Sequence, residues 1–109
     1  MYKLSDYDGK SMRVRMAMLI DDVEENASDM AKQIVDGFSD AHFCNRTRIE
    51  LDDLEEAVSE RGLTLSNALK SNIQGIYDKH LKWSLKDAGF KDIREVRVHG
   101  KSWYEFYKY

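Results

Sequence analysis

The stretch that decides the fold is HLKWSLKDAGFKDIREVRVHGKSWYEF, residues 80–106. Its first third continues an amphipathic pattern with an apolar face made of Tyr77, Leu81, Leu85 and Ala88. Gly89 follows where a helix commonly ends in a left-handed residue. The remainder is rich in Val, Ile, Trp, Tyr and Phe and is interrupted only at 99–101. We therefore expect a helix over about 76–88, followed at once by a β-hairpin with His99-Gly100-Lys101 at its tip.

The hairpin needs support from the rest of the chain, because an isolated pair of strands is only marginally stable in water. We expect Val96 and Val98 to face inward, opposite Tyr104 and Phe106. The apolar side of the hairpin should then lie on the helices.

The N-terminal third predicts one long helix over about 11–39. Apolar side chains recur there at spacings of three and four, which places on one face Met12, Met16, Leu19, Val23, Ala27, Met30, Ile34 and Phe38. Residues 12–20 also alternate like a strand, so a strand followed by a helix stays open as an alternative. Met and Ala favour the helix.

Between these regions we expect a short strand at 47–51 and two further helices. The first helix covers about 52–62, with a capping box formed by Asp52 and Glu55 and a left-handed end at Gly62. The second covers about 65–74, is capped by Thr64 or Ser66, and is interrupted by Gly75. The predicted fold is mainly α: a long N-terminal helix, three shorter helices and a C-terminal hairpin.

Composition favours a single domain over the 109 residues, of which 42% are hydrophobic. We expect residues 1–10 to be flexible. No stretch approaches the length of a membrane span, the N-terminus lacks the apolar core of a secretory signal, and the single cysteine builds no disulfide framework. These features predict a cytoplasmic protein with no membrane partner.

The net charge of -3 hides an asymmetry between the two halves of the chain. Residues 1–62 contain 8 Lys and Arg against 15 Asp and Glu, whereas residues 63–109 contain 9 against 5. A basic half joined to an acidic half is typical of a protein that meets phosphate on one face.

The basic half offers candidate contacts to nucleic acid. Burial of the apolar face at 76–88 leaves Lys79, Lys82, Trp83 and Lys86 on the outer face, where lysines favour binding to DNA phosphates. The shorter polar side chains that are candidates for reading base edges are Asn72, Gln74 and His80. Arg97, His99 and Lys101 would extend the contact from the hairpin.

The alternative interpretations of these residues are structural. A lysine stripe on a surface helix is most often a solvated face, and the aromatic residues Trp83, Trp103 and Tyr107 could pack instead of stacking on bases. The carboxylates at 21–25 and 52–56 are explained by the first turns of helices. Asp40, His42 and Cys44 fall short of a zinc site. With no nucleophile elbow or phosphate loop either, we expect no enzyme, metal or small-molecule cofactor.

The stretch quoted above resembles the recognition helix and wing of winged helix-turn-helix domains, in which an amphipathic helix, a Gly-Phe, a basic strand, a glycine turn and an aromatic strand follow one another. The resemblance covers about 47–109 and includes the small strand at 47–51. The chain departs from the pattern at 65–74, where many such domains have only a short turn, so which helix enters the groove stays open.

The resemblance implies a double-stranded DNA-binding domain that acts in replication initiation or transcription control of a phage, plasmid or other mobile element. It also implies a homodimer, for which the helix at 11–39 is the candidate surface; the alternative is that this helix covers the domain's own core.

A function of another class is a protein-binding adaptor or inhibitor that docks a basic partner on the acidic half, including Asp52, Asp53, Glu55 and Glu56. RNA binding through the basic face is a third alternative.

Overall fold

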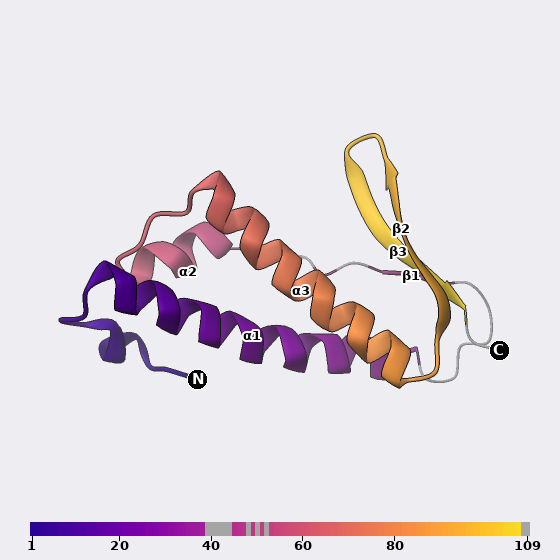
Figure 1. Cartoon of the computed structure of the whole chain (residues 1–109), viewed down its shortest axis with the longest axis horizontal. Helices are drawn as coiled ribbons and strands as arrows, with labels where there is room; N and C mark the ends of the chain where they lie inside the picture. The colour runs from indigo at the N-terminus through magenta and orange to yellow at the C-terminus, as the bar shows by residue number, and fades with distance from the viewer. Residues whose placement is uncertain (39–44, 48, 50, 52, 108–109) are drawn as a thin grey trace.

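A computed structural model of the chain describes residues 1–38, 45–47, 49, 51 and 53–107 (Figure 1). Within these residues the elements follow in the order 3-10 helix Leu4–Tyr7, α1 Met12–Asp36, β1 Asn45–Thr47, α2 Leu54–Glu60, α3 Asn67–Asp87, β2 Lys91–Val98 and β3 Lys101–Tyr107. The fold is mainly helical with a small antiparallel hairpin, as the sequence predicts. The described part has three α-helices where the sequence predicts four.

α1 confirms the predicted long helix and rules out a strand at 12–20. The Ser11 hydroxyl accepts a hydrogen bond from the Val14 amide and begins the helix. The buried face is rotated slightly from the predicted one and consists of Met18, Leu19, Asp22, Val23, Ala27, Ala31 and Val35. Met12 is 66% exposed, and Met16, Met30, Ile34 and Phe38 lie at the edge of the core.

α3 is one continuous helix, so the predicted break at Gly75 is wrong. The Ser66 hydroxyl begins it by accepting a hydrogen bond from the Leu69 amide. A glycine in a helix interior costs only about 1 kcal/mol, and the apolar face continues through it. That face consists of Leu69, Ile73, Ile76, Tyr77, Leu81 and Leu85. The predicted helices at 65–74 and 76–88 are therefore a single element.

The ends of α2 and α3 agree with the sequence where glycine is required. Gly62 and Gly89 have φ of 73° and 90°, the left-handed conformation expected after a helix. The residue before α2 is Asp53, which is itself left-handed and makes no side-chain cap, and the predicted capping box falls on a residue that the structure does not describe. Asp52 lies outside the described residues, as do Asp40, His42 and Cys44.

β3 is the central strand of a three-stranded sheet with the order β1-β3-β2. The predicted strand at 47–51 begins earlier than expected, since β1 pairs residues 45–47 with 104–106 of β3. β2 and β3 form the predicted hairpin, with a register irregularity between Lys91 and Arg94.

The hairpin register differs from the predicted one, because the turn has two residues and not three. His99 and Gly100 have φ of 52° and 75°, as a type I′ turn requires at both central positions. Lys101 therefore pairs with Val98, Val96 with Trp103 and Glu95 with Tyr104. Since side chains alternate between faces of a strand, this shift places Val96 and Val98 on the face opposite to Tyr104. Val98 is 44% exposed, whereas Tyr104 and Phe106 are buried as expected.

The core lies between α1 and α3, which run side by side, with the base of the sheet at their C-terminal ends (Figure 1). Phe106 of β3 makes edge-to-face contacts with Phe38 and Phe90, with ring centroids 5.6 Å and 5.0 Å away. The hairpin then projects from this end of the helices (Figure 1). The long axis of the molecule measures 51 Å. α2 and the hairpin lie toward opposite ends of this axis (Figure 1).

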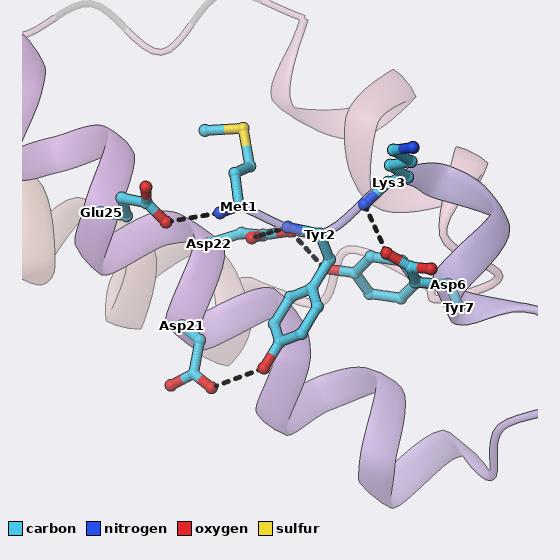
Figure 2. Close-up of polar contacts among 8 residues, drawn as sticks. All are labelled: Met1, Tyr2, Lys3, Asp6, Tyr7, Asp21, Asp22 and Glu25. Atoms are coloured by element: carbon cyan, nitrogen blue, oxygen red, sulfur yellow. Dashed lines mark hydrogen bonds and ion pairs between the residues drawn. The ribbon is translucent and has the colours of Figure 1, made fainter.

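The N-terminal segment 1–10, expected to be flexible, lies against α1 (Figure 2). Tyr7 is 2% exposed, and its hydroxyl donates a 2.7 Å hydrogen bond to Asp22. The Tyr2 amide donates to the other oxygen of the same carboxylate, at 2.9 Å. Asp22 is thus buried with both oxygens bonded, and burial followed by this bond raises the pKa of Tyr7 to about 12.

Candidate nucleic-acid interface

The outer face of α3 presents the side chains that the sequence predicts for it. Because Tyr77, Leu81 and Leu85 turn into the core, helical geometry directs positions 79, 82, 83 and 86 away from it. Lys86 and Trp83 are exposed, Trp83 by 52%, while Lys79 and Lys82 are half-buried.

These side chains border a shallow groove of about 300 Å³ at the base of the hairpin. Its lining joins the four predicted residues with Gly75, Asp78 and Tyr104. Gly75 is exposed, and a Cβ atom built on it would meet no other atom within 4 Å. The groove therefore brings helix backbone, cationic side chains and an aromatic ring to one surface.

Two of the three lysines have partners within the protein. Lys79 forms an ion pair of 3.0 Å with Glu24 of α1, and its Nζ also lies 5.0 Å from the centre of the Trp83 ring. The Nζ of Lys82 lies 5.5 Å from the centre of the Tyr104 ring. Lys86 forms no ion pair with any residue that the structure describes. The stripe thus contains one lysine held by a carboxylate, one resting on an aromatic ring and one open to solvent.

His80, a predicted base-reading residue, turns away from the groove toward α1. Its side chain is 16% exposed and its Nε2 pairs with Glu24. Its ring packs edge-to-face with that of Trp83, with the ring centroids 5.3 Å apart. The hydrogen bonds from His80 and then Lys79 hold the pKa of Glu24 below its ordinary value. In this structure His80 joins the two long helices.

Asn72 and Gln74 are exposed within the N-terminal half of α3. The sequence predicts them before the start of a separate helix at 76–88, whereas they lie inside the continuous helix. Gln74 lines a second, more polar cavity of about 300 Å³ between α3 and the hairpin. Arg97 lies at the same cavity with Glu95, to which its Nε donates a hydrogen bond of 3.1 Å. The structure therefore brings Gln74 and Arg97 together, one from the helix and one from the hairpin.

His99 and Lys101 are exposed at the hairpin tip. Lower on the hairpin, Arg94 pairs with the buried Glu105 at 3.0 Å, and the Trp103 indole N–H donates to the same carboxylate at 3.4 Å. These contacts fit the structural interpretation of Trp103.

Sequence reasoning missed three residues of this region: Glu24, Asp78 and Tyr104. Burial, followed by the charge of Asp78, raises the pKa of Tyr104 to about 12. Each of the three matters through a contact between segments far apart in the chain, so no local pattern marks it. The carboxylates at 21–25 lie in the middle of α1, so the prediction that they belong to a first turn is wrong.

The described residues contain no cluster of three or more side chains suited to hold a metal ion. Among the helices that the structure describes, none combines the length and apolar character required to cross a membrane. Comparisons of the chain with protein-family models, with curated proteins and with solved structures gave no match. The function is therefore argued from the geometry of this surface.

Proposed function

We propose that this chain is a double-stranded DNA-binding domain of the winged-helix class, with α3 as the recognition helix and the β2–β3 hairpin as the wing. The order α1-β1-α2-α3-β2-β3, with β3 central in the sheet, supports this assignment. The continuous α3 also removes the extra helical segment that set the sequence apart from the class. Since one helix leads directly into the hairpin, α3 is the element proposed to enter the major groove.

The observation that carries the proposal is the position of Lys79, Lys82 and Lys86 on the exposed side of α3, at the base of a hairpin with a basic tip. A helix fits the major groove of B-DNA, and lysines on its outer side meet the flanking phosphates. Gln74 and Asn72 lie on the N-terminal half of the same helix and are proposed to face base edges. His99 and Lys101 are proposed to contact the backbone or the minor groove.

Salt dependence of binding tests this function. Fluorescence anisotropy of a labelled random duplex, titrated at several salt concentrations, measures how many phosphates are neutralised. The proposed contacts include five cations, Lys79, Lys82 and Lys86 on α3 and Arg97 and Lys101 on the hairpin, which correspond to a slope of about −4.5 in log affinity against log salt. Loss of binding even at low salt would contradict the proposal.

Charge reversal locates the surface. Lys82→Glu with Lys86→Glu should make the slope less steep by about 2 and weaken binding strongly. Lys10→Glu with Lys32→Glu makes the same change in net charge at exposed lysines of the acidic half, and should leave binding nearly unchanged. Equal losses in the two variants would indicate attraction by net charge alone. A duplex RNA competitor separates DNA binding from RNA binding.

The biological role proposed from the resemblance is replication initiation or transcription control of a mobile element, in the cytoplasm. Selection of a preferred site from randomised duplexes is the first step toward deciding between the two roles. The homodimer through α1 stays a prediction. Most of the apolar face on which it depends packs against α3, leaving Met12 and Val14 exposed near the start of the helix. Sedimentation of the protein with and without DNA measures this state.

A further inference from the structure

A hollow of the described surface lies between α2 and the first turns of α3, away from the hairpin. It measures about 660 Å³ and is lined by Leu51, Asp53, Leu54, Glu55, Glu56, Ser59, Leu65 and Lys70. We call this the α2 groove. Its three leucines rest on the hydrophobic core and are only half-buried, so the described residues leave their outer sides uncovered.

The rim of the α2 groove is acidic. Asp53, Glu55 and Glu56 are exposed, and no described residue forms an ion pair with any of them. Three acidic residues of α1 differ in this respect, because Asp22, Glu24 and Glu25 are bonded to the N-terminal segment or to α3. Lys70 is the only basic side chain that lines the groove among the described residues. A partner with basic side chains would therefore meet unpaired carboxylates on the α2 side of an apolar floor.

We propose that the α2 groove binds an amphipathic helix of a partner protein, with two or three large apolar side chains on the leucine floor and Lys or Arg against the acidic rim. Helix-in-groove binding uses anchors at i, i+3 or i+4 and i+7, and the short α2 beside the first turns of α3 provides two helical walls for it. Charge complementarity selects a basic partner and excludes an acidic one.

This partner site is independent of the proposed DNA surface. The groove is lined by residues of α2 and the first turns of α3, whereas the lysines lie on the C-terminal half of α3. The hairpin follows the C-terminal end of α3 (Figure 1). The α2 groove shares no lining residue with the lysine groove, and only Leu51 among its described lining residues also lines the cavity of Gln74 and Arg97. One molecule can therefore hold a duplex and a basic helix at the same time, which would let the domain recruit a protein to DNA.

A designed peptide tests the site. The probe is a labelled helix of about 18 residues, with Leu at i, i+3, i+4 and i+7 and Lys at most other positions. A scrambled peptide of identical composition and a peptide with Glu in place of Lys are the controls. We expect binding of the first peptide alone, with backbone amide shifts concentrated at Leu51, Leu54 and Leu65. Equal binding of the scrambled peptide would overturn the proposal.

Matched charge reversals complete the test. Glu55→Lys with Glu56→Lys should weaken the peptide at least about tenfold, while Asp29→Lys with Glu60→Lys changes the net charge equally outside the groove and should have an effect below about twofold. Circular dichroism verifies that both variants are folded. Leu65→Ala should also weaken binding by removing part of the floor.

Three results would overturn the proposal: equal effects of the two reversals, shifts located on another face, or concentration-dependent shifts at the groove without peptide, which would assign it to a second copy of the chain. Lys82→Glu with Lys86→Glu, which tests the DNA surface, should leave peptide affinity unchanged. Failure of one site is therefore distinguishable from failure of the other.

Discussion

Substitution by alanine should have opposite effects on stability at Gly75, inside α3, and at Gly89, just after it. The two glycines differ mainly in backbone conformation. A Cβ atom added at Gly75 or at Gly89 would meet no other atom within 4 Å. Gly75 is in the interior of α3, whereas Gly89 has φ of 90°, which L-residues rarely adopt. Space is thus equal at the two positions, and the backbone decides the outcome.

Gly75→Ala should raise the free energy of unfolding by about 1 kcal/mol, the difference in helix propensity between the two residues. For a domain of this size the melting temperature should rise by about 4 °C, since unfolding entropy scales with chain length. Gly89→Ala should lower stability by about 1–2 kcal/mol, because alanine must adopt a left-handed conformation there. Urea unfolding followed by circular dichroism measures both changes.

A fall in stability on Gly75→Ala would refute the reasoning, because it would mean that α3 is broken or strained at this residue. The same variant also bears on the proposed function. Gly75 lines the groove with Lys79 and Lys82 and has no internal reason to be glycine. Under the DNA proposal its bare backbone allows close approach, so Gly75→Ala should weaken duplex binding even as it stabilises the fold.

Three further predictions concern polar contacts and the turn. The folded-state pKa of Glu24 lies below its ordinary 4.5, so its stabilising effect is present above that value and lost as pH falls through the folded pKa. Glu24→Gln should therefore flatten the decline in unfolding free energy between about pH 5 and 3. An unchanged decline would contradict the pairing. Tyr7→Phe removes a bond to the buried Asp22 and should cost about 1–3 kcal/mol in urea unfolding, whereas no loss would mean that the N-terminal segment contributes nothing. His99→Asn should stabilise the hairpin by up to about 1 kcal/mol, since Asn adopts positive φ more readily; a lower melting temperature would contradict the type I′ turn.

The sequence predicts the elements whose signals are local. The long apolar stripe predicts α1, and the glycines at 62 and 89 predict where α2 and α3 end. The Val-rich and aromatic tail predicts the hairpin. For the candidate site, the periodicity of the last helix is sufficient to place Lys82, Trp83 and Lys86 on its outer side.

Elements that depend on packing or on exact residue count were mispredicted. Gly75 reads locally as a break, but the continuous apolar face and its contact with α1 offset a cost of about 1 kcal/mol. One residue in the length of the hairpin turn decides which face Val96 and Val98 occupy, since the side-chain period is two. His80 is polar in sequence, yet a carboxylate on α1, 56 positions away, determines where its ring lies.

The distribution of paired and unpaired charges gives the two ends of the molecule different roles. In the middle of α1 the carboxylates are paired: Asp22 holds the N-terminal segment, and Glu24 holds Lys79 and His80 of α3. The acidic side chains on α2 have no such internal partner among the described residues, and neither has Lys86 at the other end of α3. Charges already paired inside the protein contribute to the fold, whereas unpaired ones of a single sign remain available for a partner of the opposite sign. The acidic α2 groove and the basic α3–hairpin surface therefore suit partners of opposite charge, and under the two proposals the protein would join a basic polypeptide to DNA.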